Sequence, residues 1–138
     1  MPSGRPRDVV VLGSGLAAPA AMDFAQKLRE CGFAPARQTD PRDFAHGDFM
    51  AFDAAQTWMV AFGHGAQLAY LGRYLDPLPA ELSVARVFDP DPGAAGAIGL
   101  FARARASFAA LVEAHALHPG PADVPRWAGR LYQLPLDG

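Results

Sequence analysis

Three charged side chains lie at helical spacing in the first quarter of the chain. Asp23, Lys27 and Glu30 follow one another at i, i+4 and i+7, so all three project from one face of a helix. A carboxylate beside a second titratable group is what general acid–base catalysis requires, and the strand ends of an α/β sheet are where ligands bind. The simpler interpretation, which the spacing alone favours, is an exposed face of ion pairs.

Four histidines are further candidates for proton transfer near neutral pH. His46 stands beside Gly47 in a predicted loop, and His64 stands between two glycines at the end of a predicted strand. Each is equally well an ordinary loop histidine. His115 and His118 lie near the end of a predicted helix, where they suit its dipole. No two histidines have a metal-ligand spacing with a carboxylate, so we expect no metal ion.

Gly13-Ser14-Gly15 joins a short apolar run to a helical segment. With the next three residues it satisfies the loose G-x-G-x-x-A form of the dinucleotide-binding fingerprint. The acidic residue that would hold a ribose is missing, because residues 36–39 read Ala-Arg-Gln-Thr. We therefore interpret the segment either as an anion-binding turn or as a tight strand-to-helix connection, and we expect no cofactor.

The spacing of apolar residues predicts the elements that position these groups. Strands are expected at 8–12, 33–38, 57–63 and 82–88, and helices at 17–31, 44–52, 65–75 and 98–117. Alternating strands and helices predict an α/β fold: a three-layer sandwich around a parallel sheet of four to five strands, of the flavodoxin or Rossmann type. Residues 1–138 are predicted to form a single domain, with residues 119–138 packing on it or on a partner.

Composition argues against several classes of protein. The chain has 138 residues, of which 51% are hydrophobic and 19% charged, which fits one folded domain. A net charge of −2 and the lack of a basic cluster argue against nucleic-acid binding. The apolar runs are strand-sized, so we expect no membrane association. The single cysteine, Cys31, cannot form an internal disulfide, which agrees with a cytoplasmic location.

Residues 12–53 resemble the second isomerase domain of glucosamine-6-phosphate synthase, a member of the SIS (sugar isomerase) domain family. That domain reads roughly L-G-R-G-x-x-Y-P-x-A-x-E-x-A-x-K-L-K-E and, after fifteen residues, H-G-P. The matching positions in this chain, at the same spacing, are residues 12–15, Pro19, Ala21, Asp23, Ala25, residues 27–30 and His46-Gly47. A fainter match covers residues 123–126 and Arg130.

The resemblance implies roles for these residues. Glu30 would move a proton between C1 and C2 of an open-chain phosphosugar, and His46 would help to open the sugar ring, often from a neighbouring subunit. Lys27 and Asp23 would support them electrostatically. The positions implied to bind substrate are Gly13, Ser14, Gly15, Asp23 and Arg130. The ligand would be a sugar phosphate or a related derivative, and the partner a second copy of the chain or another SIS-domain subunit.

The chain also departs from the family. Arg130 stands where the family has a lysine that forms a Schiff base, and a guanidinium that stays protonated cannot do so, although it can hold a phosphate or carboxylate. The Ser/Thr-rich phosphate loop of a preceding SIS domain, S-x-S-G-x-T, does not occur in this sequence. Two functions are therefore expected. One is half of an aldose–ketose isomerase, aminotransferase-type isomerase or deglycase site, and the other is a regulatory or interaction module without catalysis.

Overall fold

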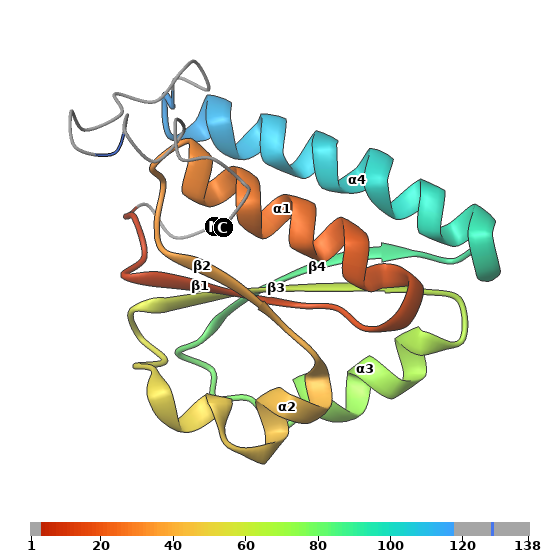
Figure 1. Cartoon of the computed structure of the whole chain (residues 1–138). Helices are drawn as coiled ribbons and strands as arrows, with labels where there is room; N and C mark the ends of the chain where they lie inside the picture. Colours follow the sequence, from red (N-terminus) through yellow and green to blue (C-terminus); the bar gives the residue numbers. More distant parts are fainter. Residues whose placement is uncertain (1–3, 118–127, 129–138) are drawn as a thin grey trace, which may run out of the picture.

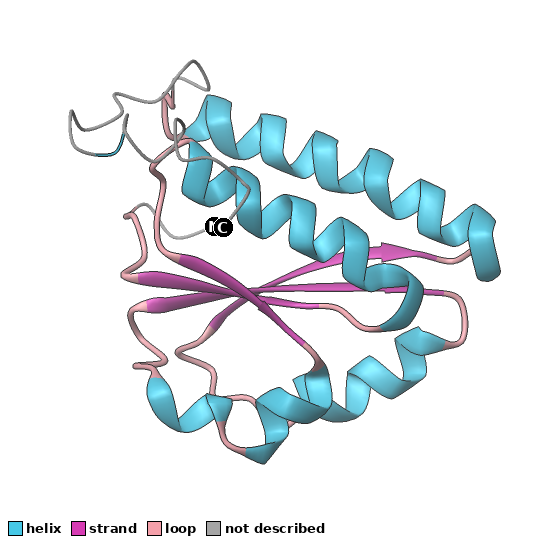
Figure 2. Cartoon of the chain, in the orientation of Figure 1, coloured by secondary structure: helices cyan, strands magenta, loops and turns pink. Residues whose placement is uncertain are grey.

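Strands and helices alternate along the chain, as the sequence predicts. The computed structural model describes residues 4–117 and residue 128 (Figures 1 and 2). The elements are β1 (Asp8–Leu12), η1 (Gly15–Ala17), α1 (Ala18–Glu30), β2 (Ala36–Thr39), α2 (Pro41–His46), η2 (Asp48–Ala51), β3 (Thr57–His64), α3 (Gln67–Leu75), β4 (Ser83–Asp89) and α4 (Gly93–Ala114). Here η1 and η2 are short 3-10 helices.

The strands form one parallel sheet in the order β2-β1-β3-β4. Helices α1 and α4 cover one face, and α2 and α3 cover the other (Figure 1). The order of the strands reverses between β1 and β3, because β2 follows β1 on one side and β4 follows β3 on the other. In open α/β sheets, ligands bind outside the carboxyl ends of the strands at such a reversal.

The two central strands have apolar residues on both faces. Val9 and Val11 of β1 pack in the core beneath α1 and α4, whereas Val10 and Leu12 pack in a second core on the side of α2. A strand covered on both faces has a continuous apolar run rather than an alternating one. The run at residues 8–12 therefore predicted both the strand and the three-layer arrangement correctly.

Several predicted boundaries were wrong. The helix expected at 44–52 is replaced by α2, which ends at His46, and the 3-10 helix η2, with Gly47 between them. The second strand begins at Ala36 rather than at residue 33, because Phe33 turns into the core, where its ring lies 5.6 Å from that of Trp58, and Pro35 has no amide hydrogen for the ladder. Helix α4 begins at Gly93, five residues before the predicted start. Residues 94–97 lack the large apolar side chains on which the predicted start depends, but three of them are alanine, the strongest helix former.

Helix α4 is long and apolar enough to cross a membrane by length and composition, which the strand-sized apolar runs did not reveal. In the structure it is a layer over the sheet. Leu100 is fully buried against the sheet, Arg103 pairs with Asp89 of β4, and Arg105 pairs with Asp23 of α1. The expected absence of membrane association stays a prediction.

The predicted C-terminal segment, residues 119–138, lies outside the described residues except for residue 128. The same holds for His118, for the match at 123–126 and for Arg130. Their predicted roles stay predictions.

Candidate functional site

The turn after β1 lies at the carboxyl edge of the sheet. A Cβ at Gly13 would lie 2.6 Å from Cβ of Ala21, so glycine is needed for α1 to pack closely on the strand. Gly15 has φ of +51°, and the carbonyl of Ser14 accepts from the amide of Ala17 at 3.0 Å. These contacts support the interpretation as a tight strand-to-helix connection. They leave the predicted binding role of Gly13, Ser14 and Gly15 untested.

A second glycine-rich turn follows β3 and lies beside the first. Gly65 has φ of +50°, and its amide donates to the carbonyl of Asp89 at 3.0 Å. The side-chain Nε2 of Gln67 donates to the carbonyl of Ser14 at 3.3 Å. This bond joins the turns of β1 and β3 at the point where the strand order reverses.

His64 is buried at this edge of the sheet. Its side chain is 5% exposed, and its Cβ lies 3.0 Å from the position that a Cβ on Gly96 of α4 would take. Within the described part of the chain, neither ring nitrogen of His64 nor Oε1 of Gln67 has a partner. An imidazole carries at least one N–H donor in any tautomer, and a buried donor left unpaired costs about 1–3 kcal/mol. These buried atoms therefore keep unused hydrogen-bonding capacity at the carboxyl edge.

Asp89, which pairs with His64 in the sheet register, is a carboxylate that already has an ion-pair partner. Nε of Arg103 donates to it at 2.9 Å, and the amide of Asp91 donates at 3.0 Å. The Arg103 guanidinium, followed by the Asp91 amide, holds the pKa of the Asp89 carboxyl below its ordinary value of 3.8. The carboxylate fits against α4 because Gly99 has no side chain there.

Three helices begin at this edge without a side-chain cap. Among the described residues, α1, α3 and α4 have no side-chain N-cap and no acidic residue in the first turn. Helix α2 differs, because Asp40 caps it by accepting from the amide of Arg42 at 2.8 Å. Uncapped N-termini carry partial positive charge and unpaired N–H groups, which suit an anion. The edge between β1 and β4 is therefore electrostatically suited to a phosphate.

Asp23 and Lys27 lie between α1 and α4 rather than at this edge. Oδ1 of Asp23 lies 3.6 Å from Nζ of Lys27, and Oδ2 lies 3.3 Å from Nε of Arg105. Their side chains are only 27% and 22% exposed, respectively. The structure thus places them in an ion-pair network that joins two helices, which is the simpler of the two interpretations of their spacing.

Glu30 lies at the far end of α1. Its side chain is exposed and accepts from Nε2 of Gln26 at 2.6 Å. Helix α1 has 13 residues, so Glu30 is separated from the turn at Ser14 by about 20 Å. A phosphate bound at the carboxyl edge and the Glu30 carboxylate therefore do not meet on one hexose within a single chain.

His46 ends α2 on the opposite face of the sheet from α1 (Figure 1). Its side chain is exposed. The nearby Asp48 carboxylate accepts from the hydroxyl of Thr39 at 2.8 Å, which fixes the chain after His46. One chain therefore does not bring Glu30 and His46 together, and a site that uses both needs two chains.

The other two candidates, His115 and Cys31, both contact protein groups in the structure. The ring of His115 lies 5.1 Å from that of Phe33 and 5.7 Å from that of Trp58, at the end of α4. Sγ of Cys31 donates to the carbonyl of Leu28 at 3.5 Å. No group of three or more His, Cys, Asp or Glu side chains suited to a metal occurs among residues 4–117.

The sequence identified His64 as a candidate for proton transfer, with an ordinary loop histidine as the alternative, but it did not identify Gln67 or Asp89. The available signal was a polar residue at the end of each of two buried strands, followed in one case by a second glycine-rich turn. Because parallel strands end at one edge, those polar residues had to lie close together.

Solved structures with the same fold include proteins named as sugar-phosphate isomerases. No family model and no curated protein sequence matches the chain. A Listeria monocytogenes protein named as a sugar-phosphate isomerase superposes with a TM-score of 0.62 at 17% identity, over 84% of this chain and 73% of that one. The C-terminal domain of glucosamine-fructose-6-phosphate aminotransferase from Francisella tularensis gives 0.58 at 16% identity, over 82% of this chain and 37% of that one.

A Bacteroides fragilis protein named as a phosphosugar isomerase involved in capsule formation gives a TM-score of 0.64 at 12% identity, over 80% of this chain and 71% of that one. The predicted resemblance is thus confirmed for the fold, including the parallel sheet and its helical layers. The chain has the fold shared by the SIS-domain sugar-phosphate isomerases.

Proposed function

We propose that this chain is a phosphosugar-binding SIS domain and that it holds the phosphate at the carboxyl edge of its sheet. The observation that carries the proposal is His64, which is buried and unpartnered within the described residues beside the uncapped starts of α3 and α4. A phosphate would accept from the imidazole and from backbone amides at these helix starts. These donors would replace the hydroxyl-rich loop that the sequence lacks.

The proposed reaction is an isomerisation at a site shared between two chains. Glu30 would be the base that moves a proton between C1 and C2, and His46 the group that opens the ring, with the phosphate held by a partner's carboxyl edge. The separation of about 20 Å between Glu30 and the Ser14 turn supports this division, because one chain cannot supply both ends of the site. The partner would be a second copy or a separate SIS-domain subunit, in the cytoplasm.

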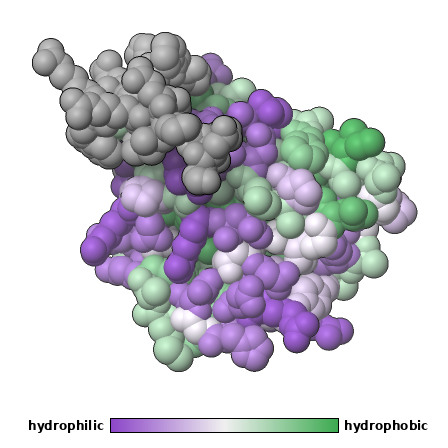
Figure 3. Space-filling view, viewed as in Figure 1, coloured by the Kyte–Doolittle hydropathy of each residue, from purple (hydrophilic) through white to green (hydrophobic). Residues whose placement is uncertain are grey.

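An apolar surface on the α1–α4 layer supports a second copy as that partner. Ile98 is 72% exposed, Met22 57% and Leu16 53%. Figure 3 shows hydrophobic surface over the start of α4. Covering such side chains in a dimer removes apolar area from water, which favours association.

The alternative function is a regulatory or interaction module that binds a phosphosugar without converting it. Glu30 favours this alternative, because its carboxylate is exposed and bonded to Gln26 rather than held beside an acid. The variant Glu30→Gln separates the two functions. An isomerase loses turnover with little change in sugar-phosphate affinity, whereas a module shows no turnover in either form.

The proposed binding is tested by a thermal-shift screen against hexose 6-phosphates, amino-sugar phosphates, the unphosphorylated sugars and NAD(P). A ligand at about 100 times its Kd adds roughly 2.7 kcal/mol to the free energy of unfolding. We expect a shift with a sugar phosphate, none with the matching free sugar, and a smaller shift in His64→Asn. The matched control is His115→Gln, at the other end of the molecule. A shift with NAD(P) alone would contradict the proposal.

A further inference from the structure

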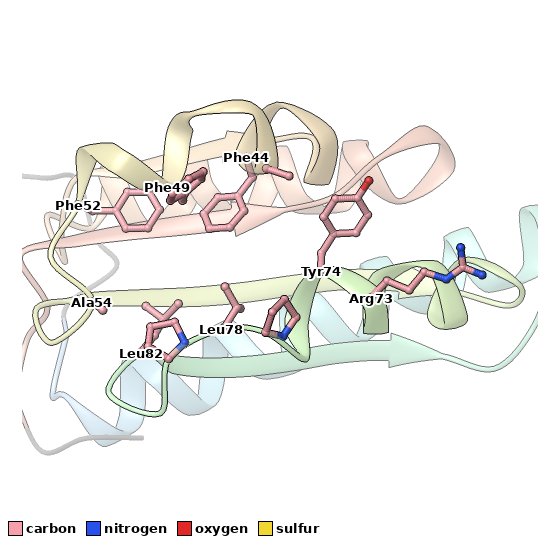
Figure 4. Close-up of a pocket in the computed structure, with 11 residues that line it drawn as sticks. Phe44, Phe49, Phe52, Ala54, Arg73, Tyr74, Leu78 and Leu82 are labelled. Carbon is pink, nitrogen blue, oxygen red and sulfur yellow. The ribbon is translucent and has the colours of Figure 1, made fainter.

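A cavity separate from the carboxyl edge lies on the face of the sheet covered by α2 and α3. Its volume is about 530 Å³, and it opens between the α2–η2 segment and the loop from α3 to β4 (Figure 4). Its lining includes Ala54 and Leu82, which lie just before β3 and β4, so it extends toward the amino edge of the sheet. A volume of this size is typical of sites for small organic molecules.

Two apolar walls face each other across this cavity. One wall is aromatic: the rings of Phe44 and Phe52 have centroids 5.5 Å apart and planes 23° from parallel, and the ring of Phe49 lies 6.4 Å from that of Phe44. The opposite wall holds Leu78 and Leu82 (Figure 4). Phe44 is buried, whereas Phe49 is 46% exposed at the surface. A compact molecule that enters between the walls therefore leaves water on both of its sides.

Among the described residues, no charged side chain points between these walls. Arg73 belongs to the lining, but its guanidinium extends along α3 and away from the phenylalanine rings (Figure 4). The hydroxyl of Tyr74 lies 2.9 Å from that of Tyr70, so it already has a hydrogen-bond partner. An ion that entered the cavity would lose its hydration without gaining an ion pair, which is unfavourable. The distribution of charge therefore favours an uncharged occupant.

We propose that this cavity binds a small uncharged molecule with an aromatic or aliphatic body. The body would lie between the phenylalanine rings and the two leucines, where burial of apolar area drives binding. The same walls discriminate against a phosphorylated sugar, because they offer no partner for its charge. The cavity shares no residue with the carboxyl edge, so this site is independent of the proposed phosphosugar binding.

The probe for this site is N-phenyl-1-naphthylamine, an uncharged molecule whose fluorescence rises in apolar surroundings. Its matched control is 8-anilino-1-naphthalenesulfonate, which has the same aromatic body with a sulfonate added. We expect the uncharged probe to bind one per chain, at least about tenfold more tightly than the sulfonate. Equal affinity for the two probes, or no binding of the uncharged probe, overturns the proposal.

A cavity-filling variant shows whether the probe binds here. Ala54→Phe should abolish binding of the uncharged probe, whereas Ala55→Phe, one residue outside the lining, should leave it unchanged. Undiminished binding in Ala54→Phe contradicts the assignment of the site. A smaller mass for Ala54→Phe than for the wild type in light scattering would assign the cavity to a contact between two copies, which also overturns the proposal.

A pair of surface variants keeps the test decisive if Ala54→Phe does not fold. Phe49→Asp replaces a ring of the aromatic wall by a carboxylate and should weaken binding of the uncharged probe at least about tenfold. Met50→Asp makes the same change of charge at the next residue, which is 78% exposed and outside the lining, and should leave the affinity within about twofold. An equal effect of the two variants contradicts the role of the aromatic wall.

Discussion

Removing the Asp23 carboxylate tests whether the charged face of α1 serves structure or substrate. Asp23 pairs with Lys27 at 3.6 Å and with Arg105 at 3.3 Å, and all three side chains keep some contact with water. Pairs of this kind contribute about 0.2–1 kcal/mol each, so Asp23→Ala should lower the free energy of unfolding by about 0.5–2 kcal/mol. Most of that loss should disappear in concentrated salt, which screens the pairs.

The assay is urea denaturation of four proteins: the wild type, Asp23→Ala, Arg105→Ala and the double variant. If the pair joins α1 to α4, the double-mutant cycle gives a coupling energy of about 0.2–1 kcal/mol between the two residues. Sugar-phosphate affinity should stay within about twofold, a difference well under 1 kcal/mol. A coupling energy of zero together with lost affinity would refute the structural role and return Asp23 to the predicted substrate-binding set.

Three further outcomes are expected. Gly13→Ala should destabilise the protein by about 1–3 kcal/mol because the new Cβ meets Ala21. Gly72→Ala, where the space is open, should instead stabilise helix α3 by about 0.5–1 kcal/mol. Thermal unfolding of the two variants measures both effects. The Asp89 carboxyl has a lowered pKa in the folded protein, so its contribution is present above pH 4 and is lost as pH falls through the folded pKa. The Tm gap between wild type and Asp89→Asn should therefore close on acidification, and a constant gap would contradict the ion pair. Ile98→Asp should turn a dimer into a monomer in light scattering, and an unchanged mass would exclude this face as the interface.

The sequence was sufficient for the parts of the fold that depend on local pattern. The apolar runs of β1 and β3 predicted buried parallel strands, and the glycines at 13 and 15 predicted the tight turn between β1 and α1. The start of α4 was missed because its first turns are alanine and glycine, which carry no apolar periodicity.

The candidate site was harder to predict because it depends on strand order. Fixed spacing placed Glu30 and His46 in one motif, but β2 and β3 lie on opposite sides of β1, so the helices that carry these residues cover opposite faces of the sheet. The same order brings the turns after β1 and β3 together, which joins Ser14 and Gln67. Neither arrangement can be read from local spacing, since each depends on pairing between distant segments.

The most direct test of phosphate binding at the carboxyl edge is nuclear magnetic resonance of the labelled protein during titration with fructose 6-phosphate and, separately, with fructose. We predict that fructose 6-phosphate shifts the ring resonances of His64 and the amides at the starts of α3 and α4, and that fructose does not. Replacing His64 by Asn should then weaken binding about ten- to a hundredfold, the value of a hydrogen bond to a charged group. No shift at the highest concentration, or shifts confined to residues away from this edge, would contradict the proposed site.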